Sequence, residues 1–107
     1  MAINVDADRA AARTAAALSA DELLLLSNVP GVLRDPADPT SVITTADGGA
    51  IEQVRRAAVG RMKNKVLAAE EALTGGVARV VIGSAKGESA IARARAGAGT
   101  VFEGARA

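Results

Sequence analysis

Glu22-Leu-Leu-Leu-Leu-Ser-Asn-Val-Pro-Gly31 joins a continuous apolar run to a polar turn that ends in glycine. A short apolar run bounded by turn residues is typical of a strand that is buried on both faces, as in a parallel sheet. In open α/β sheets, ligands bind outside the carboxyl ends of such strands. We therefore predict a buried strand over 22–26, followed by a turn over 27–31 that either simply ends the strand or receives a ligand.

Helical and strand patterns alternate on both sides of this stretch. We predict, in order, a helix over 9–18, the strand over 22–26, an exposed loop over 33–40, a short strand over 41–45, helical spacing from 51 to 58, a helix over 61–73, a strand over 79–82, a short helix over 88–96 and a closing strand over 100–102. This order predicts an α/β fold with three αβα layers and a mostly parallel sheet. Without a linker, residues 1–107 form a single domain.

The helix over 61–73 has the clearest pattern. Met62, Val66, Ala69 and Leu73 recur at helical spacing and form one apolar stripe. The pair Gly75-Gly76 follows directly, and glycine is the preferred residue just beyond a helix C-terminus. We expect this helix to cover one face of the sheet.

The composition excludes several classes of function. The 107 residues contain no cysteine and no histidine, which removes disulfides, thiolate nucleophiles, Cys/His zinc sites and histidine-dependent triads. The formal net charge is +1 and Phe102 is the only aromatic residue, so nucleic-acid binding has no electrostatic or stacking support. The start of the chain lacks the pattern of a signal peptide, and no run is long enough to span a bilayer. A cytoplasmic location is the default expectation.

Two further places carry polar residues in a suggestive arrangement. Asn4, Asp6 and Asp8 stand at alternate positions before the first helix, where one can cap the helix and the others can hold a ligand. Gly60-Arg-Met-Lys-Asn-Lys65 opens the helix over 61–73 with three cations, which a helix N-terminus disfavours unless an anion is bound there. The alternatives, capping alone and solvated lysines paired with Glu70 or Glu71, stay open. Of the two lysines, Lys65 lies beside the apolar stripe and is expected to point inward.

These motifs, in this order, resemble the C-terminal half of acetylglutamate kinases in the amino acid kinase family. The resemblance rests on Asn-Val-Asp-Ala-Asp8, Leu-Leu-Leu-Leu-Ser-Asn-Val-Pro-Gly31 and Gly-Arg-Met-Lys-Asn-Lys65, with Ala-Gly-Ala-Gly-Thr-Val-Phe102 as a last strand. Asn28 stands where acetylglutamate kinases more often have Asp, and this turn is similar to that of the kinase that acts on carrier-protein-linked aminoadipate or glutamate.

The resemblance implies a role for each motif. Asn4 would contact the amino acid substrate, Asp8 would orient the phosphate-binding lysines, and Lys65 would stabilise charge on the transferred phosphoryl group. The implied nucleotide-binding residues come from the two glycine-containing segments: Ser27, Asn28, Val29, Gly31, Gly60, Met62 and Lys65. ATP would be the cofactor, with Mg2+ held mainly by its phosphates. Phosphoryl transfer needs positioning and positive charge more than covalent help, which suits a chain without histidine or cysteine.

The implied protein is a kinase for a γ- or δ-carboxylate, either of acetylglutamate or of a carrier-linked amino acid, in arginine or lysine biosynthesis. Family members also have an N-terminal lobe with a glycine-rich phosphate loop and a further catalytic lysine. We therefore expect this chain to be the C-terminal nucleotide-binding lobe, inactive alone and self-associating. It would be a fragment, a truncated gene product, or one half of a split enzyme whose partner is a separate N-terminal half. The alternative is a non-catalytic nucleotide-binding module or a remnant.

Overall fold

The computed structural model describes residues 11–12, 14, 16–18, 21–35, 37–46, 50–86 and 89–103. The elements follow in the order β1 (Glu22–Ser27), α2 (Ala50–Ala57), α3 (Arg61–Thr74), β2 (Arg79–Ser84), α4 (Ala90–Arg95) and β3 (Thr100–Glu103). Within the helix predicted over 9–18, helical backbone is described at Ala11, Ala12, Thr14, Ala16 and Ala17. The predicted strands over 22–26, 79–82 and 100–102 and the predicted helix over 61–73 are confirmed, with ends that differ by at most two residues. The expected burial of the first strand on both faces is wrong: β1 lies at one end of the described sheet, and Leu25 is its only buried residue.

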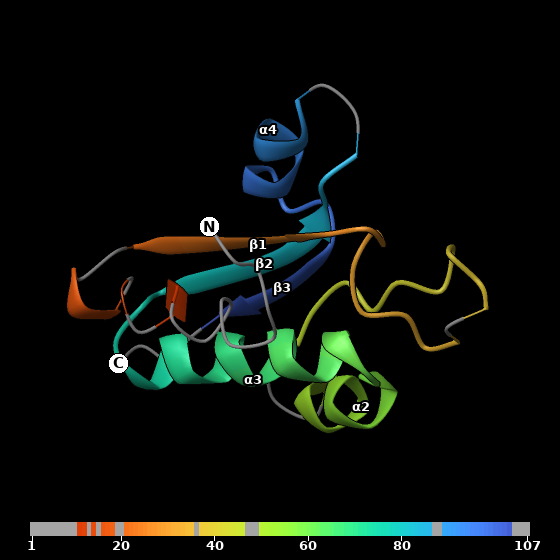
Figure 1. The fold of residues 1–107 in the computed structure, drawn as a ribbon, viewed down its shortest axis with the longest axis horizontal. Coiled ribbons are helices and arrows are strands. Elements are labelled where there is room, and N and C mark those ends of the chain that lie inside the picture. The colour runs from red at the N-terminus through yellow and green to blue at the C-terminus, as the bar shows by residue number, and fades with distance from the viewer. Residues whose placement is uncertain are drawn as a thin grey trace.

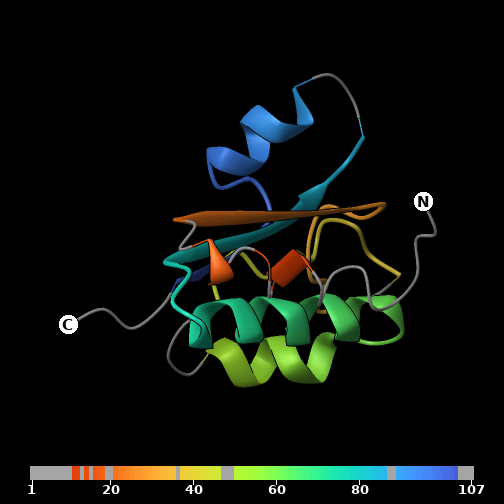
Figure 2. The same ribbon diagram turned by 60° about the vertical axis from the view of Figure 1, so that its left-hand side comes forward.

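The elements form layers around one sheet. Helix α4 covers one face, where it packs on β1 and β2, and α3 covers the other, where it packs on β2 and β3 (Figure 1). Helix α2 packs against α3 on the side away from the sheet, as the turned view makes clear (Figure 2). The α/β class and the αβα layering predicted from the sequence are confirmed.

The sheet has the strand order β1-β2-β3. Strands β1 and β2 are parallel, in register from Glu22 opposite Arg79 to Ser27 opposite Ser84. Strand β3 runs antiparallel to β2, so the expected parallel pairing holds for one of the two pairs. The cause is the short connection: a six-residue helix is only about 9 Å long, whereas a six-residue strand spans about 20 Å. Because α4 cannot return the chain to the start of β2, β3 begins at the carboxyl end of β2 and runs back.

The core consists almost entirely of small aliphatic side chains around one aromatic ring. Phe102 on β3 is fully buried, and Val66 and Ala69 of the predicted stripe on α3 are buried with it, while Met62 and Leu73 pack at the margin. A helix face of alanine and valine lets α3 approach the sheet closely, which compensates for the lack of large side chains. The core thus fixes the N-terminal end of α3 relative to the sheet.

The segment predicted as a strand over 41–45 makes only isolated pairings. Val42 pairs antiparallel with Leu33, and Thr45 pairs parallel with Val101. The segment changes partner after three residues, from the loop after β1 to the sheet edge at β3, so neither pairing extends into a ladder. Residues 41–45 therefore connect the loop after β1 to strand β3, and this segment is here called the tether.

Candidate functional site

The turn over 27–31 lies at the carboxyl end of β1, beside the carboxyl end of β2. The Ser27 carbonyl accepts a hydrogen bond from the Ala85 backbone N–H at 2.8 Å, which fixes the start of the turn to the end of β2. Asn28 is exposed, and Val29 and Pro30 are half-buried. The turn therefore occupies the place where open α/β sheets bind ligands, as the sequence predicts.

Gly31 is buried and has no room for a side chain. A Cβ atom built on it would lie 2.9 Å from the Thr100 Oγ1 and 3.1 Å from the Val42 Cγ1. Such separations are below ordinary van der Waals contact, so any larger residue would displace the turn from β3. Gly31 therefore allows the turn to approach Thr100 and Val42 closely, and its φ is not positive.

The second predicted segment begins at Gly60, where α2 gives way to α3. Gly60 has φ 56° and ψ −130°, and the Met62 N–H donates to the Val59 carbonyl at 3.1 Å. These values describe a type II′ turn, whose first central position is dominated by glycine. A Cβ at Gly60 would meet open space, so glycine is required by the backbone conformation, and the space above it stays accessible.

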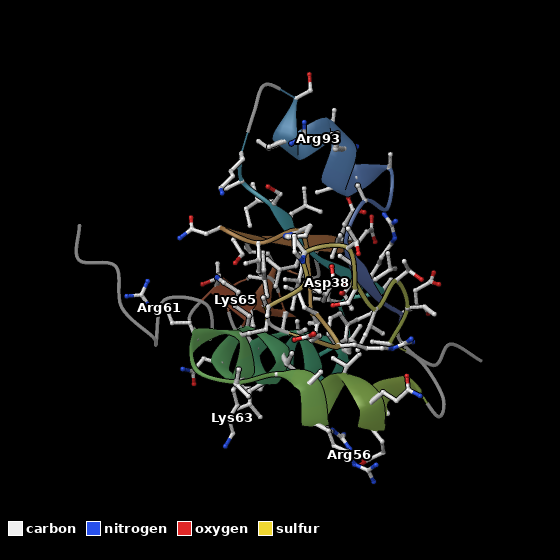
Figure 3. The ribbon with its side chains drawn as sticks, turned by 90° about the vertical axis from the view of Figure 1, so that its right-hand side faces the viewer. Asp38, Arg56, Arg61, Lys63, Lys65 and Arg93 are labelled. Carbon is white, nitrogen blue, oxygen red and sulfur yellow. The ribbon has the colours of Figure 1, made fainter. Side chains whose placement is uncertain are left out.

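The cations at the start of α3 point in different directions. Lys63 and Arg61 are exposed, whereas Lys65 is half-buried. Figure 3 places Lys65 on the sheet side of α3 and Lys63 on the opposite side, as expected from the position of Lys65 beside the apolar stripe. The first turn of this 14-residue helix contains no acidic residue, so the positive end of the helix dipole and these cations both make the local electrostatic potential more positive.

Glu70, one of the two acids considered as partners of the lysines, is instead bonded to Arg55, which weakens that alternative. The Arg55 Nε of α2 donates to the Glu70 carboxylate at 2.9 Å, and Arg55 also bonds Glu52. The bonds to Glu70 first, and to Glu52 second, raise the pKa of the Arg55 guanidinium above its ordinary value. This surface link joins α2 to α3 and holds the helix junction together.

The turn after β1 and the junction between α2 and α3 meet around one cavity of about 160 Å3, here called the α3-side cavity. Its lining comes from both segments: Val29, Gly31 and Leu33, then Ala57, Val59 and Met62. Of the expected nucleotide-binding residues, Val29, Gly31 and Met62 lie together in this lining. Ser27, Asn28, Gly60 and Lys65 are outside this lining, although Gly60 separates two lining residues.

Sequence reasoning missed Leu33, Ala57 and Val59. Val59 is 58% exposed, which is unusual for a large apolar residue beside a turn. An apolar residue directly before the glycine of a charged turn is the signal that could have indicated Val59, which lies in the connection between α2 and α3.

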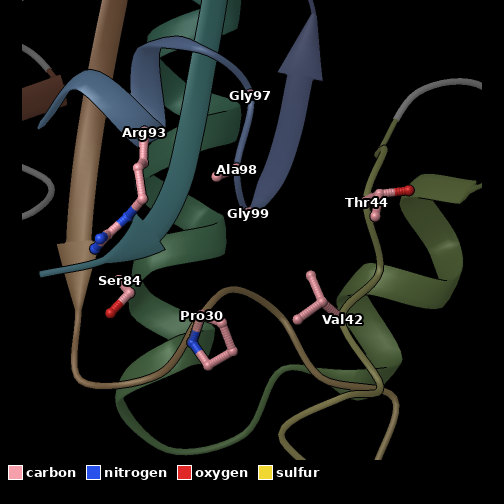
Figure 4. Close-up of a pocket in the computed structure, with 8 residues that line it drawn as sticks. All are labelled: Pro30, Val42, Thr44, Ser84, Arg93, Gly97, Ala98 and Gly99. Carbon is pink, nitrogen blue, oxygen red and sulfur yellow. The ribbon is translucent and has the colours of Figure 1, made fainter. Parts of the chain in front are cut away.

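A larger cavity of about 440 Å3, the α4-side cavity, lies at the same edge of the sheet (Figure 4). It is lined from α4, from the ends of the strands and from the loops between them: Pro30, Val42, Thr44, Ser84, Arg93, Gly97, Ala98 and Gly99. In Figure 4, Arg93 extends from α4 toward Ser84, and its guanidinium donates to the Lys86 carbonyl. The Ser84 hydroxyl accepts from the Lys86 N–H at 3.1 Å. The sequence analysis did not predict this cavity.

Asn4 and Asp8 lie outside the described residues, so their predicted roles stay predictions. Within the part of the chain that is described, no helix is long and apolar enough to cross a membrane. In the same part, no three or more acidic side chains gather in a group that could hold a metal ion.

The exposed loop before the tether has its own polar network. The Thr40 hydroxyl and backbone N–H donate to the Asp38 carboxylate at 2.7 and 2.9 Å. These two bonds, the side-chain bond first, hold the pKa of the Asp38 carboxyl below its ordinary value of 3.8. Asp38 lines neither cavity.

The model of the amino acid kinase family matches residues 2–84, which is most of the chain. This chain belongs to the amino acid kinase family. It is 55% identical over 101 residues to the [LysW]-aminoadipate kinase of Deinococcus radiodurans and 45% identical over 102 residues to that of Thermus thermophilus, each time over 94% of this chain. It is also 45% identical over 103 residues to the acetylglutamate kinase of Rubrobacter xylanophilus. The chain spans 35 to 39% of the length of these relatives.

Solved structures give the same fold. An N-acetylglutamate synthase from Neisseria gonorrhoeae, complexed with coenzyme A and L-arginine, matches 90% of this chain with a TM-score of 0.75 and 26% identity. The match covers 23% of that protein. The protein smu.665 from Streptococcus mutans matches 94% of this chain with a TM-score of 0.67 and 26% identity, over 36% of its own length.

Proposed function

We propose that residues 1–107 form the nucleotide-binding lobe of an ATP-dependent kinase that phosphorylates the side-chain carboxylate of an N-blocked or carrier-linked acidic amino acid. The observation that carries the proposal is the α3-side cavity. It joins the turn after the parallel strand β1 to the glycine turn at a helix N-terminus. A base and a phosphate chain need these two surfaces side by side.

The size and lining of the α3-side cavity suit the base of the nucleotide. Pockets that bury a whole drug-sized ligand measure roughly 300–1,000 Å3, and about 160 Å3 takes only a flat part of one. Val29, Val59 and Met62 provide apolar contact for a planar base, while the sugar and the phosphates stay outside. The exposed apolar surface of Val59 would then be covered by the ligand.

The phosphates would lie toward the start of α3. The open space above Gly60 and the absence of acids from the first turn suit an anion. Lys65, half-buried on the sheet side of α3, is the residue that we assign to stabilise charge on the transferred phosphoryl group. Mg2+ would be held mainly by the phosphates.

The remaining roles rest on the resemblance to the family. We assign Asn4 to the amino acid substrate and Asp8 to the orientation of the lysines, and we keep Ser27 and Asn28 as nucleotide contacts from the strand end. The most similar of the relatives reported above is a [LysW]-aminoadipate kinase, which favours a carrier-linked acceptor in lysine biosynthesis over acetylglutamate in arginine biosynthesis. A cytoplasmic location fits a donor such as ATP.

The length of the chain limits the activity that we propose for it alone. It spans 35% of the relative from Deinococcus radiodurans, so the proposed reaction requires a second lobe that supplies the rest of the substrate pocket. Residues 1–107 would bind that lobe or associate with themselves. The second candidate, a nucleotide-binding module without catalysis, is favoured by the position of the α3-side cavity wholly inside this chain.

The test of nucleotide binding is a calorimetric titration of the chain with Mg-ATP, with Lys65→Ala and Lys63→Ala as a matched pair. Both substitutions remove one positive charge from the same helix, but only Lys65 lies on the sheet side. We expect saturable binding that Lys65→Ala weakens by about tenfold or more and Lys63→Ala much less, because a charge-assisted contact is lost only in the first case. Equal losses, or no binding by the folded chain, would refute this site.

Catalysis separates the kinase from the binding module. We would mix the chain with a separately produced N-terminal part of the aminoadipate kinase from Deinococcus radiodurans, which is 55% identical to this chain over the matched residues. The acyl phosphate is trapped with hydroxylamine. Turnover that needs both parts and is lost with Lys65→Ala supports the kinase, whereas ATP binding without turnover supports the binding module.

A further inference from the structure

Thr100 is the only polar residue that is fully buried in the part of the chain that the structure describes. It is the first residue of β3 and pairs with Ile82 in the middle of the sheet. A buried hydroxyl in an otherwise aliphatic core costs free energy unless both its proton and its lone pairs are used. The partners of Thr100 therefore indicate what this residue is for.

The Thr100 hydroxyl closes a ring of three hydrogen bonds between segments far apart in the chain. Its Oγ1 accepts from the Val32 N–H at 2.9 Å and donates to the Ile43 carbonyl at 2.6 Å. The Ile43 N–H donates to the Val32 carbonyl at 2.8 Å, which completes the ring. Val32 and Ile43 are themselves buried, so water does not replace any of these bonds.

This ring lies directly under the turn that lines the α3-side cavity. Gly31 precedes Val32, and the position of a Gly31 Cβ would be only 2.9 Å from the Thr100 Oγ1 and 3.1 Å from the Thr100 backbone nitrogen. Gly31 and Val29 both line the cavity. The distance between the cavity wall and β3 is therefore set by the Thr100 side chain.

We propose that Thr100 is the positioning residue of the nucleotide site. It holds the turn over 27–31 at the distance from β3 that brings Val29 and Gly31 opposite Val59 and Met62. It does so without touching the ligand. The proposal rests on the proposed function, because it takes the α3-side cavity as the place where the base binds. It adds a residue of the last strand, 69 positions after Gly31 in the chain, to a site otherwise built from the turn and the start of α3.

The experiment compares Thr100→Val, which keeps the shape and removes the hydroxyl, with Thr100→Ser, which keeps the hydroxyl. Val77→Ala is the control for general loss of stability, because Val77 is buried between α3 and β2 and lines neither cavity. Mg-ATP affinity is measured at a temperature where all three variants are folded by circular dichroism. We expect about a tenfold loss for Thr100→Val, recovery in Thr100→Ser and near wild-type affinity in Val77→Ala.

Wild-type affinity in Thr100→Val, or an equal loss in Val77→Ala, overturns the proposal. Amide hydrogen exchange at Val32 provides a readout that does not depend on nucleotide. Thr100→Val should speed exchange at Val32 more than at Val80, a buried amide of the sheet, and Thr100→Ser should restore the wild-type rate. If the wild-type chain binds no nucleotide, the proposed function fails, and unchanged exchange at Val32 would then also remove the role of Thr100 in holding the turn.

Discussion

The α3-side cavity and the α4-side cavity share the turn over 27–31 as a wall, since Val29 and Gly31 line the first and Pro30 lines the second. The α4-side cavity is the larger, at about 440 Å3 against about 160 Å3, and it also contains a cation. That cation, Arg93, already donates to the Lys86 carbonyl. Beside the smaller cavity, a 14-residue helix begins with three cationic residues and has no acidic residue in its first turn, whereas α4 has only six residues.

The comparison teaches that the surroundings of a cavity indicate its ligand better than its volume does. A helix of four turns presents the positive end of its dipole at its start, which favours phosphate, although the Met62 and Lys63 N–H groups of α3 already donate to the Val59 and Gly60 carbonyls. A cavity whose polar groups already bond one another has fewer contacts left to offer. The proposed nucleotide site is therefore the α3-side cavity and not the larger α4-side cavity.

The largest expected effect is on the stability of the core and does not distinguish the two cavities. Phe102→Ala should lower the free energy of unfolding by about 3–5 kcal/mol, because it leaves a void under the only sheet in the described part of the chain. Ile91→Ala is the control, since Ile91 is 60% exposed on α4, and it should change stability by about 0.5 kcal/mol or less. Urea unfolding followed by circular dichroism measures both. A small effect of Phe102→Ala would mean that the core lies elsewhere.

An intermediate effect separates the two cavities. Met62→Ala removes apolar contact from the α3-side cavity and should weaken Mg-ATP binding by about tenfold, the equivalent of about 1.4 kcal/mol. Arg93→Ala changes the α4-side cavity and should leave the affinity within about twofold, because Arg93 does not line the α3-side cavity. Calorimetric titration of both variants provides the readout. The opposite ranking would place the nucleotide beside α4.

The smallest expected effect concerns a region outside both cavities. The pKa of Asp38 should lie below 3.8, and Thr40→Val should raise it toward that value, because the hydroxyl bond is the main cause of the shift. A lowered pKa in the folded state adds stability above the unfolded pKa, and this is lost as the pH falls through the folded value. Carboxyl-carbon NMR titration measures it. A change in Mg-ATP affinity at neutral pH in Thr40→Val would link this loop to the site after all.

Local sequence patterns predicted the elements that local physics determines. The apolar run of β1, the stripe on α3 and the glycines that end α3 each depend on neighbours within a few residues, and each was predicted. The inward position of Lys65 followed from the same helical spacing and is confirmed by Figure 3.

Features that depend on distant partners were not predictable in this way. The direction of β3 depends on how short α4 is, and the tether over 41–45 depends on two separate partners. Thr100 bonds residues 57 and 68 positions away, so nothing near it in the sequence indicates its role. Among the residues that line the α3-side cavity, Val29, Gly31 and Met62 belong to segments with a recognisable motif and were singled out from the sequence. Val59 belongs to no such motif and was missed.

The most direct test of the central claim maps the nucleotide onto the two cavities in one experiment. Backbone amide chemical shifts of the 15N-labelled chain are recorded with increasing Mg-ATP. We predict that the shifts which change most belong to Val29, Gly31, Val59 and Met62 around the α3-side cavity, with smaller changes at Ser84, Arg93 and Ala98. Changes concentrated at Ser84, Arg93 and Ala98 would contradict the account and place the nucleotide in the α4-side cavity.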